Sequence, residues 1–334
     1  MRNCKPLISV VIATYRRCDT LKITLEKLSV QSIAPHDFEV IVVDDGSGDK
    51  TSEMVHSMIS KMPYTLKYMW HENRGPGYTE NRGIQEARSD LLLLIADDIW
   101  ATPDLLIQHI KMHKENTEES VAVLGNVIQS PDLPATVMHK NWDGFHIHKF
   151  KGMREVPGIF FYACNISVKK NFLLENGMFR ERKGAAHEDA ELGYRLSRHG
   201  LKILHNEDAL AYHFHEESLE RCCKRAYERG LNFDMLSDNI PKPYVFPIYK
   251  IATLEAGLKA FLKILPREIV RRCVFNKWSI HKFWLPVLKK AETNRLAELF
   301  ASSLTYRGTT SFFLREGFKE LQASRRRQSE NKLR

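Results

Sequence analysis

The sequence contains no apolar run of about 18 residues, the length that a membrane-spanning helix needs. Its N-terminal apolar stretch, LISVVIA, is short and leads into TYRR, without the longer apolar core and the small-residue cleavage site of a signal peptide. The six cysteines include no Cys-x-x-Cys pair, and in a chain of 334 residues they indicate free thiols in a reducing compartment. We therefore expect a cytoplasmic protein. Peripheral contact with the inner face of the membrane is a second expectation, which depends on the charge of the C-terminal part.

Acidic residues are scarce in the last part of the chain. Residues 241–334 hold 20 Lys and Arg against 7 Asp and Glu, a net charge of +13, whereas residues 1–240 carry −4. The segment LPREIVRRCVFNKWSIHKFWLPVLKK interleaves this charge with aromatic residues, which is typical of a helix on an anionic membrane surface. A helical cap on a catalytic domain fits the same composition equally well. No recognition motif supports nucleic-acid binding, and we expect none.

Strands and helices alternate along the first hundred residues. Continuous apolar runs, typical of strands buried on both faces, are separated by segments with apolar residues at helical spacing. This alternation predicts an α/β protein with a parallel sheet wrapped by helices. The last segment, ASRRRQSENKLR, is expected to be a disordered tail. The expected strands are 8–12, 40–43, 66–70 and 91–95, and the expected helices include 77–88, 103–115 and 186–200.

Two pairs of aspartates directly follow apolar strands, Asp44 with Asp45 and Asp97 with Asp98. Parallel sheets bind ligands at the carboxyl ends of their strands. Carboxylate oxygens are the usual ligands of Mg²⁺ and Mn²⁺, and phosphate oxygens complete the shell. The pattern therefore suits a nucleoside diphosphate held through a divalent cation. The alternative is that these residues only shape turns and helix starts, which aspartate favours.

The stretch DDGSGDKTS lacks two familiar phosphate-binding patterns. A dinucleotide fingerprint would need a third glycine where Thr51 stands, and a P-loop would need a glycine where Asp49 precedes the lysine. Both patterns would also follow the first strand of the sheet and not the second. Neither reading is therefore adopted.

Six segments occur in a characteristic order over about residues 7–230: SVVIATYRR, VIVVDDGSGDKT, ENRGPGYTENRGIQEARSD, LLLIADDIWATPDLL, FYACNISVKK and HEDAELGYRLSRHG. Together they resemble the inverting family 2 glycosyltransferases, although each segment alone is weak. The resemblance implies a GT-A fold, with a Rossmann-like mixed sheet flanked by helices, here followed by a helical C-terminal extension. It also implies a nucleotide-diphosphate sugar donor and a divalent metal, Mn²⁺ or Mg²⁺.

The resemblance also implies roles for individual residues. Asp98 matches the aspartate that coordinates the metal on the diphosphate, and His213 matches a histidine that completes the metal site in some relatives. Asp189 matches the catalytic base, while Tyr15 and Asp45 match residues that hold the base and the ribose of the nucleotide. The residues expected to contact the donor are Ala13, Thr14, Tyr15, Arg16, Asp44, Asp45, Arg74 and Asp97.

The chain departs from the family pattern at two places. The usual Asp-x-Asp would begin at position 96, which is Ala96 here, and this weakens the expectation of a metal. A segment that commonly reads Ala-Arg-Asn reads Thr79-Glu80-Asn81, which leaves Arg74 as the expected phosphate contact. His215 lies close to His213, but the resemblance gives it less support, and a packed histidine is the alternative for both.

Inverting sugar transfer needs a base that takes the proton of the acceptor hydroxyl. Asp189 is expected at the start of a helix, where the helix dipole would hold its carboxylate ionised, and Glu188 would orient the acceptor. The alternative is that both are merely acids at a helix start.

The sequence therefore predicts a GT-A catalytic domain over residues 1–240 and a basic helical region over 241–334. The expected reaction transfers a sugar from a nucleotide-diphosphate sugar, expected to be a UDP-sugar, to a hydroxyl of a glycan or glycolipid acceptor. It is expected to proceed with inversion and to depend on a metal. One alternative is a non-catalytic nucleotide-sugar-binding protein, which Ala96 suggests. Another is a membrane- or nucleic-acid-binding module on an α/β scaffold.

Overall fold

The computed structural model describes residues 5–134, 136, 145, 150–243, 258–292 and 303–333. The chain divides into two compact units, each with its own packing. The first unit lies within Met1–Leu133, Gly144–Gly184 and Glu188–His215, and the second within Pro134–Asp143, Ala185–His187 and Glu216–Arg334.

The first half of the sheet is parallel, as the strand–helix alternation predicts. Its strands lie in the order β3-β2-β1-β4, and every neighbouring pair is parallel. Most apolar side chains of β1, β2 and β4 are buried, as expected for strands covered on both faces. All four predicted strands are confirmed: β1 (Ile8–Thr14), β2 (Phe38–Asp44), β3 (Thr65–Trp70) and β4 (Leu91–Ile95).

The second half makes the sheet mixed, as the GT-A resemblance implies. Among the described residues the full order is β3-β2-β1-β4-β8-β6-β9-β5, with β7 also paired to β9. Strand β8 is antiparallel to both β4 and β6, and β5 is antiparallel to β9. The additional strands are β5 (Ile99–Ala101), β6 (Val121–Gln129), β7 (Glu155–Val156), β8 (Asn165–Lys169) and β9 (Lys202–His213).

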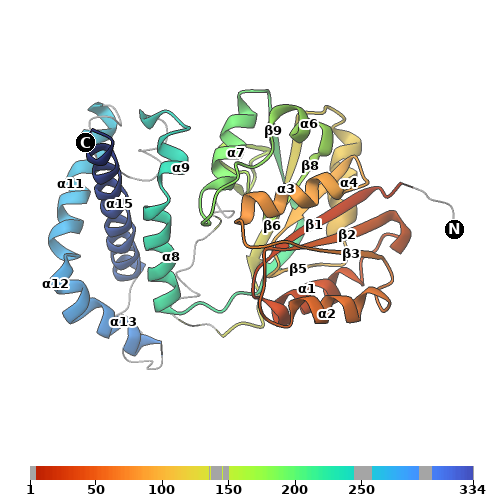
Figure 1. Cartoon of the computed structure of the whole chain (residues 1–334), viewed down its shortest axis with the longest axis horizontal. Helices are drawn as coiled ribbons and strands as arrows, with labels where there is room; N and C mark the ends of the chain where they lie inside the picture. Colours follow the sequence, from red (N-terminus) through yellow and green to blue (C-terminus); the bar gives the residue numbers. More distant parts are fainter. Residues whose placement is uncertain are drawn as a thin grey trace. The chain divides into compact units, whose positions relative to one another are not determined.

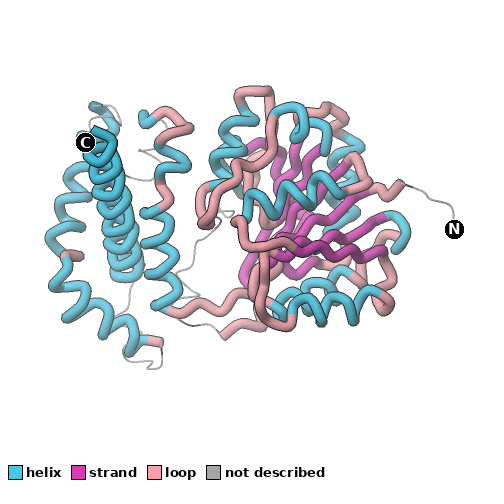
Figure 2. Tube along the Cα trace, viewed as in Figure 1, coloured by secondary structure: helices cyan, strands magenta, loops and turns pink. Residues whose placement is uncertain are grey.

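Helices lie on both sides of this sheet (Figures 1 and 2). Helix α3 packs closely on β1 and β2, because Gly83 faces Val11 and Val43 and a Cβ there would clash with Val11. The predicted helices are confirmed with small shifts of their ends. The helices of this unit are α1 (Cys18–Leu28), α2 (Thr51–Ile59), α3 (Pro76–Glu86), α4 (Leu105–Glu115), α6 (Lys170–Asn176) and α7 (Glu188–Ser197), with short 3₁₀ turns η1 (Pro35–Asp37) and η3 (Gly158–Phe160).

The second unit is helical in its described part. Helices α8 and α15 lie side by side (Figure 1) and approach closely, because Gly230 faces the Leu314 carbonyl and Gly317 faces the Tyr227 carbonyl. No helix among the described residues has the length and apolar character needed to cross a bilayer. The elements are α8 (Leu219–Leu231), α9 (Asp234–Ser237), α11 (Leu258–Val274), α12 (Lys277–Ser279), η5 (Ile280–Trp284), α13 (Leu285–Ala291) and α15 (Ser303–Leu333).

The structure differs from the sequence expectation at the C-terminal tail. Helix α15 continues through Leu333, so the segment expected to be disordered is helical as far as the structure describes it. Arg325 gives a physical reason, because its guanidinium lies 3.0 Å from the Asp238 carboxylate and 3.5 Å from that of Asp234.

Helices α8 and α9 also belong to the second compact unit, whereas the prediction placed residues up to 240 in the catalytic domain. The functional boundary at residue 240 stays a prediction.

Candidate active site

The end of β4 places two buried carboxylates side by side. Asp97 accepts a 2.8 Å hydrogen bond from the Thr14 hydroxyl at the end of β1, and Arg17 donates to it at 3.0 Å. The Thr24 hydroxyl of α1 donates to the Asp97 carbonyl at 2.7 Å, which fixes the backbone at this turn. Asp98 is also buried and pairs with Arg17. The parallel register of β1 and β4 therefore brings the predicted residues Thr14, Asp97 and Asp98 together.

Two histidines reach Asp98 from strand β9 and the residues just after it. Antiparallel pairing of β5 with β9 sets Ile99 opposite His213, which puts the histidine beside the aspartate that precedes Ile99. His213 Nε2 lies 3.5 Å and His215 Nδ1 lies 3.1 Å from Asp98 Oδ2, and the two imidazole rings are stacked. One ligand atom from each of these three residues lies within 4.8 Å of the other two.

This donor set is chemically suited to a divalent transition ion. Asp98 and His213 are buried and His215 is partly buried. The three side chains offer one carboxylate oxygen and two imidazole nitrogens, so phosphate oxygens would complete the shell of an ion held there. Mg²⁺ prefers oxygen ligands throughout, so the two imidazole nitrogens suit a transition ion better than Mg²⁺. The residues therefore fit a divalent metal of the kind that the family resemblance implies, with His215 as a candidate ligand that the sequence supported only weakly.

The two aspartates differ in their acidity. Burial raises the pKa of Asp97 to about 6, and the positive charge of Arg17 opposes that rise. Burial would also raise the pKa of Asp98, but hydrogen bonds from His213 and His215 and the charge of Arg17 hold it well below its usual range. Asp98 is therefore the carboxylate that stays ionised over the ordinary pH range, as a metal ligand must.

Arg17 is a site residue that the sequence analysis missed. Its guanidinium contacts Asp97 and Asp98, and its Nη2 lies 3.2 Å from His215 Nδ1. The sequence analysis took Arg16 instead, whose backbone N–H donates to the Ser47 hydroxyl at 2.7 Å and whose φ is 54°. A left-handed residue at Arg16 turns the chain and directs the next side chain toward the acids. The sequence shows two adjacent arginines at a strand end, and this pattern does not determine which of the two faces inward.

The aspartates that end β2 support the backbone around them. Asp44 accepts a 2.8 Å hydrogen bond from the Ser47 N–H and a 2.7 Å bond from the Tyr68 hydroxyl. Asp45 accepts from the Arg74 N–H at 2.7 Å and from the Gly75 N–H at 3.1 Å, which fixes the turn that starts α3. The turn-forming alternative thus describes what both carboxylates do here, and their contact with a nucleotide stays a prediction.

The remaining predicted donor contacts lie at the surface. Ala13 is partly buried, and Tyr15 is 42% exposed at the end of β1, with the Arg16 guanidinium 5.1 Å from its ring centre. Arg74 is also exposed, and its guanidinium stacks 3.8 Å above the Tyr78 ring and lies 3.8 Å from the Glu181 carboxylate. An exposed aromatic ring and an exposed guanidinium are suitable contacts for a nucleotide, but their role stays a prediction.

Asp189 occupies the first turn of α7, as predicted. The Ala163 N–H donates to its Oδ2 at 3.2 Å, and part of the residue remains accessible to solvent. The expectation that the helix dipole holds it ionised is not met. Burial of the carboxyl, followed by the like charge of Glu188, raises the pKa of Asp189 to about 8. Loss of hydration outweighs the dipole here, and a pKa near 8 suits a general base better than an ordinary aspartate does.

Glu80 is a second residue that the sequence analysis did not place in the site. It is buried on α3, and its Oε2 has no hydrogen-bond partner among the described residues. Burial and the charges of Asp189, Glu188 and Asp97 raise its pKa well above the usual value. The sequence feature that could have indicated its role is an acid at a position where arginine is common in the family.

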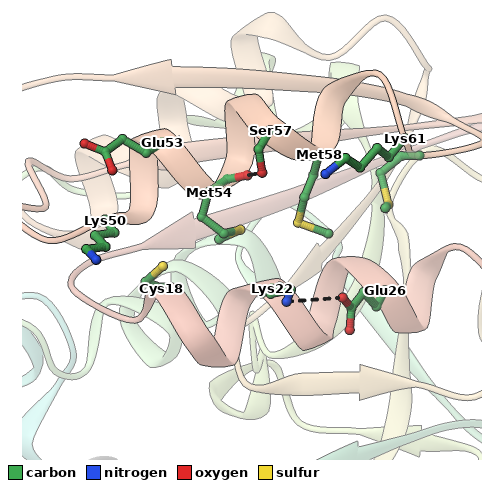
Figure 3. Close-up of a pocket in the computed structure, with 10 residues that line it drawn as sticks. Cys18, Lys22, Glu26, Lys50, Glu53, Met54, Ser57, Met58 and Lys61 are labelled. Atoms are coloured by element: carbon green, nitrogen blue, oxygen red, sulfur yellow. Dashed lines mark hydrogen bonds and ion pairs between the residues drawn. The ribbon is translucent and has the colours of Figure 1, made fainter.

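A separate hollow of about 520 Å³ opens between α1 and α2. Figure 3 shows its lining, in which the Lys22–Glu26 ion pair of α1 faces Met54 and Met58 of α2. The residues that line it include none of the aspartates and histidines described above. We therefore assign the candidate active site to the strand ends and not to this hollow.

Comparison with known proteins decides the family. The family model described as glycosyl transferase family 2 matches residues 9–175, which is half of the chain and includes the strand-end acids. The chain belongs to glycosyl transferase family 2. Within the family, curated relatives include the validoxylamine A glucosyltransferase of Streptomyces hygroscopicus subsp. limoneus, 30% identical over 59% of this chain and 49% of the relative. The chondroitin synthase of Escherichia coli is 27% identical over 71% of this chain and 39% of the relative. This family 2 chain thus spans about half the length, or less, of these two relatives.

Solved structures support the same fold for this family 2 chain. The mannosyltransferase PcManGT from Pyrobaculum calidifontis, in complex with GDP-Man and Mn²⁺, has a TM-score of 0.57 at 15% identity, covering 93% of this chain and 87% of that chain. S. aureus TarS 1–349, in complex with UDP-GlcNAc, has a TM-score of 0.52 at 19% identity, covering 90% of both chains. The predicted GT-A fold is therefore confirmed.

Proposed function

We propose that this chain is an inverting, metal-dependent glycosyltransferase that takes its sugar from a nucleotide-diphosphate donor. The observation that carries the proposal is the convergence of Asp98, His213 and His215 within a family 2 fold. A metal ligand set at a strand end of such a fold suits the diphosphate of a nucleotide sugar. The solved structures with GDP-Man and Mn²⁺ and with UDP-GlcNAc show that this fold holds such ligands. We propose a UDP-sugar as the donor and a glycan or glycolipid hydroxyl as the acceptor.

Two parts of the site contribute to the proposed reaction, one at the diphosphate of the donor and one at the hydroxyl of the acceptor. Asp98, His213 and His215 would hold the ion, which neutralises charge on the departing diphosphate. Asp189 would accept the proton of the acceptor hydroxyl as that oxygen attacks the anomeric carbon. The glycosidic bond then forms as the bond to the diphosphate breaks, and the opposite approach inverts the configuration. Arg17 would keep Asp97 and Asp98 oriented and partly neutralised.

Thermal unfolding with a panel of donors tests the proposal. The panel is UDP-glucose, UDP-N-acetylglucosamine and GDP-mannose, each with Mn²⁺, with Mg²⁺ or with EDTA. At least one donor should raise the melting temperature with Mn²⁺ and much less with EDTA, because a ligand at 100 times its Kd stabilises by about 2.7 kcal/mol. Asp98→Asn should lose most of this metal-dependent shift, since the amide oxygen carries no charge.

Asp208→Asn is the matched control, because Asp208 lies exposed on the same strand as His213 and should behave as the parent. Equal donor shifts of the parent in EDTA and in Mn²⁺ would refute the metal role. Product formation with the stabilising donor and an alcohol or glycan acceptor then separates a transferase from a protein that only binds nucleotide sugars.

We also propose that the second unit contacts an anionic membrane surface. Helices α11 and α12 and the η5 segment expose large apolar side chains beside exposed basic ones, such as Lys277 and Lys282. The net charge of +13 over residues 241–334 complements anionic lipid, and aromatic side chains suit the headgroup region. The exposed apolar residues are Leu258, Leu262, Ile269, Val270, Val274, Trp278 and Phe283.

Vesicle co-sedimentation tests this surface. The double change Lys277→Glu and Lys282→Glu should lower partitioning onto phosphatidylserine vesicles at low salt by about 30-fold or more, because each basic residue near such a surface contributes about 1 kcal/mol. Reversing the exposed Lys111 and Lys114 on α4 changes the net charge equally and should have much less effect. Equal losses in both double variants, or no binding by the parent, would contradict the proposed surface.

A further inference from the structure

Glu80 is a buried acid whose carboxyl lacks a complete set of partners among the residues that the structure describes. Its side chain is 8% exposed, and its Oε2 has no hydrogen-bond partner among the described residues. Leaving a buried polar atom unpaired costs about 1–3 kcal/mol, so such atoms are rare unless something other than the protein bonds to them. The position therefore calls for an explanation beyond packing.

The helix that carries Glu80 is held firmly in place. Asn81, the next residue, donates to the Phe179 carbonyl and accepts from the Phe179 N–H, both at 2.9 Å. The Thr79 hydroxyl donates to the Gly75 carbonyl at 2.9 Å, and Gly77 lies against the Arg180 carbonyl. Glu80 is thus fixed between two anchored neighbours, and a ligand would meet its carboxyl in a defined position.

The acids around Glu80 belong to both parts of the proposed site. The charges that act on it come from Asp97 at the end of β4 and from Glu188 and Asp189 at the start of α7. Burial, followed by these like charges, raises the pKa of the Glu80 carboxyl well above the usual value. Glu80 is therefore within electrostatic reach of acids on the proposed donor side and on the proposed base side.

The transferred sugar must lie between these two sides. In an inverting transfer the leaving diphosphate and the attacking hydroxyl are on opposite faces of the anomeric carbon, so the ring is between the metal ligands and Asp189. We propose that Glu80 binds a hydroxyl group of the sugar that is transferred and thereby selects the donor. A neutral carboxyl both donates and accepts hydrogen bonds, as a sugar hydroxyl does, whereas a phosphate offers acceptors alone. This inference rests on the proposed function.

Paired affinity measurements test Glu80. The affinities of UDP against UDP-glucose, UDP against UDP-N-acetylglucosamine and GDP against GDP-mannose are measured with Mn²⁺ by calorimetry. Glu80→Ala should weaken the sugar nucleotide that the parent prefers about tenfold or more, while the matching free diphosphate changes less than twofold. Glu80→Gln should stay within threefold of the parent for both ligands, because its neutral amide has the same reach and also donates and accepts.

Glu86 supplies the matched control, since it is an exposed acid on the same helix that pairs with Lys67. Glu86→Ala should match the parent for every ligand. Glu80→Asp, which keeps the acid but shortens its reach, should show the sugar-selective loss and serves if the alanine variant fails to fold. Equal weakening of the sugar nucleotide and the free diphosphate, or no weakening of either, would overturn the inference. A parent that binds no nucleotide at all would instead remove the proposed function, and the inference with it.

Discussion

Replacing Asp189 with asparagine should lower the rate of sugar transfer by about 10²–10⁴-fold, which is the usual contribution of a general base. Asparagine has nearly the same shape and cannot accept a proton at neutral pH. Donor affinity should change less than threefold, because Asp189 lies at the start of α7, whereas the proposed metal ligands lie after β4, on β9 and just after β9. Measuring kcat and donor affinity on one purified variant separates a chemical role from a structural one. Turnover within threefold of the parent would end the assignment.

The acidity of Asp189 adds a second readout. Since its pKa is raised to about 8, the turnover of the parent should rise with pH and level off above about pH 8. Glu188→Gln removes a like charge that contributes to this rise, so the acidic limb of its profile should move to lower pH. A profile that stays in place in the Glu188 variant would contradict the electrostatic coupling.

Removing an ordinary acid from a helix start lowers the free energy of unfolding, but Asp189→Asn should not lower it. The pKa of Asp189 is higher in the folded chain than the value of about 3.9 in an unfolded one, so the proton is held by the fold. Its contribution to the free energy of unfolding is complete below about pH 4 and is lost as the pH rises through about 8. Asp189→Asn should therefore be no less stable than the parent at pH 7 and more stable at pH 9.

Removing the guanidinium of Arg17 should destabilise the first unit by about 2–4 kcal/mol in the absence of metal. Breaking a buried ion pair leaves an uncompensated charge and costs about 3–5 kcal/mol, and the lower figure here allows for the third of the Arg17 side chain that is exposed. Arg17→Met keeps much of the apolar volume of the side chain. Urea unfolding in EDTA measures the loss.

Manganese should restore the Arg17 variant more than it stabilises the parent, because the ion supplies positive charge beside Asp98. Arg88→Met is the matched control, since Arg88 pairs with buried Glu39 at 2.7 Å in the same unit, and Glu39 is not part of the metal cluster. The control should lose stability without a comparable recovery in Mn²⁺. Equal recovery in the two variants would show that Arg17 has no particular relation to the proposed metal ligands.

The apolar runs of the sequence were sufficient to predict the inner strands and the acids that follow them. A run such as LLLLI, which is apolar at every position, suits the middle of a sheet, where both faces are covered. Once the strands are parallel, the residues after them share one edge, which is why Thr14 and Asp97 meet as expected. The family resemblance added Asp189 and His213, which spacing alone would have left among ordinary helix-start acids and packed histidines.

The sequence could not predict which neighbours would control the chemistry. The role of Arg17 depends on the left-handed turn at Arg16, and the position of His215 depends on the register between β5 and β9. The acidity of Asp189 depends on how completely the surrounding chain excludes water, which no local pattern specifies. The helical C-terminal tail could not be predicted for a similar reason. It is held by contacts of Arg325 with residues about ninety positions earlier in the chain.

The placement of β5 determines when during synthesis the proposed metal ligands can meet. Strand β5 ends at Ala101, yet its partner in the sheet, β9, is not complete until His213. A ribosome must therefore add more than a hundred residues before Asp98 gains its histidines, whereas Arg17 has already been made when Asp98 emerges. During that interval Arg17 can pair with the new carboxylates, whereas the proposed metal site still lacks two of its three side chains.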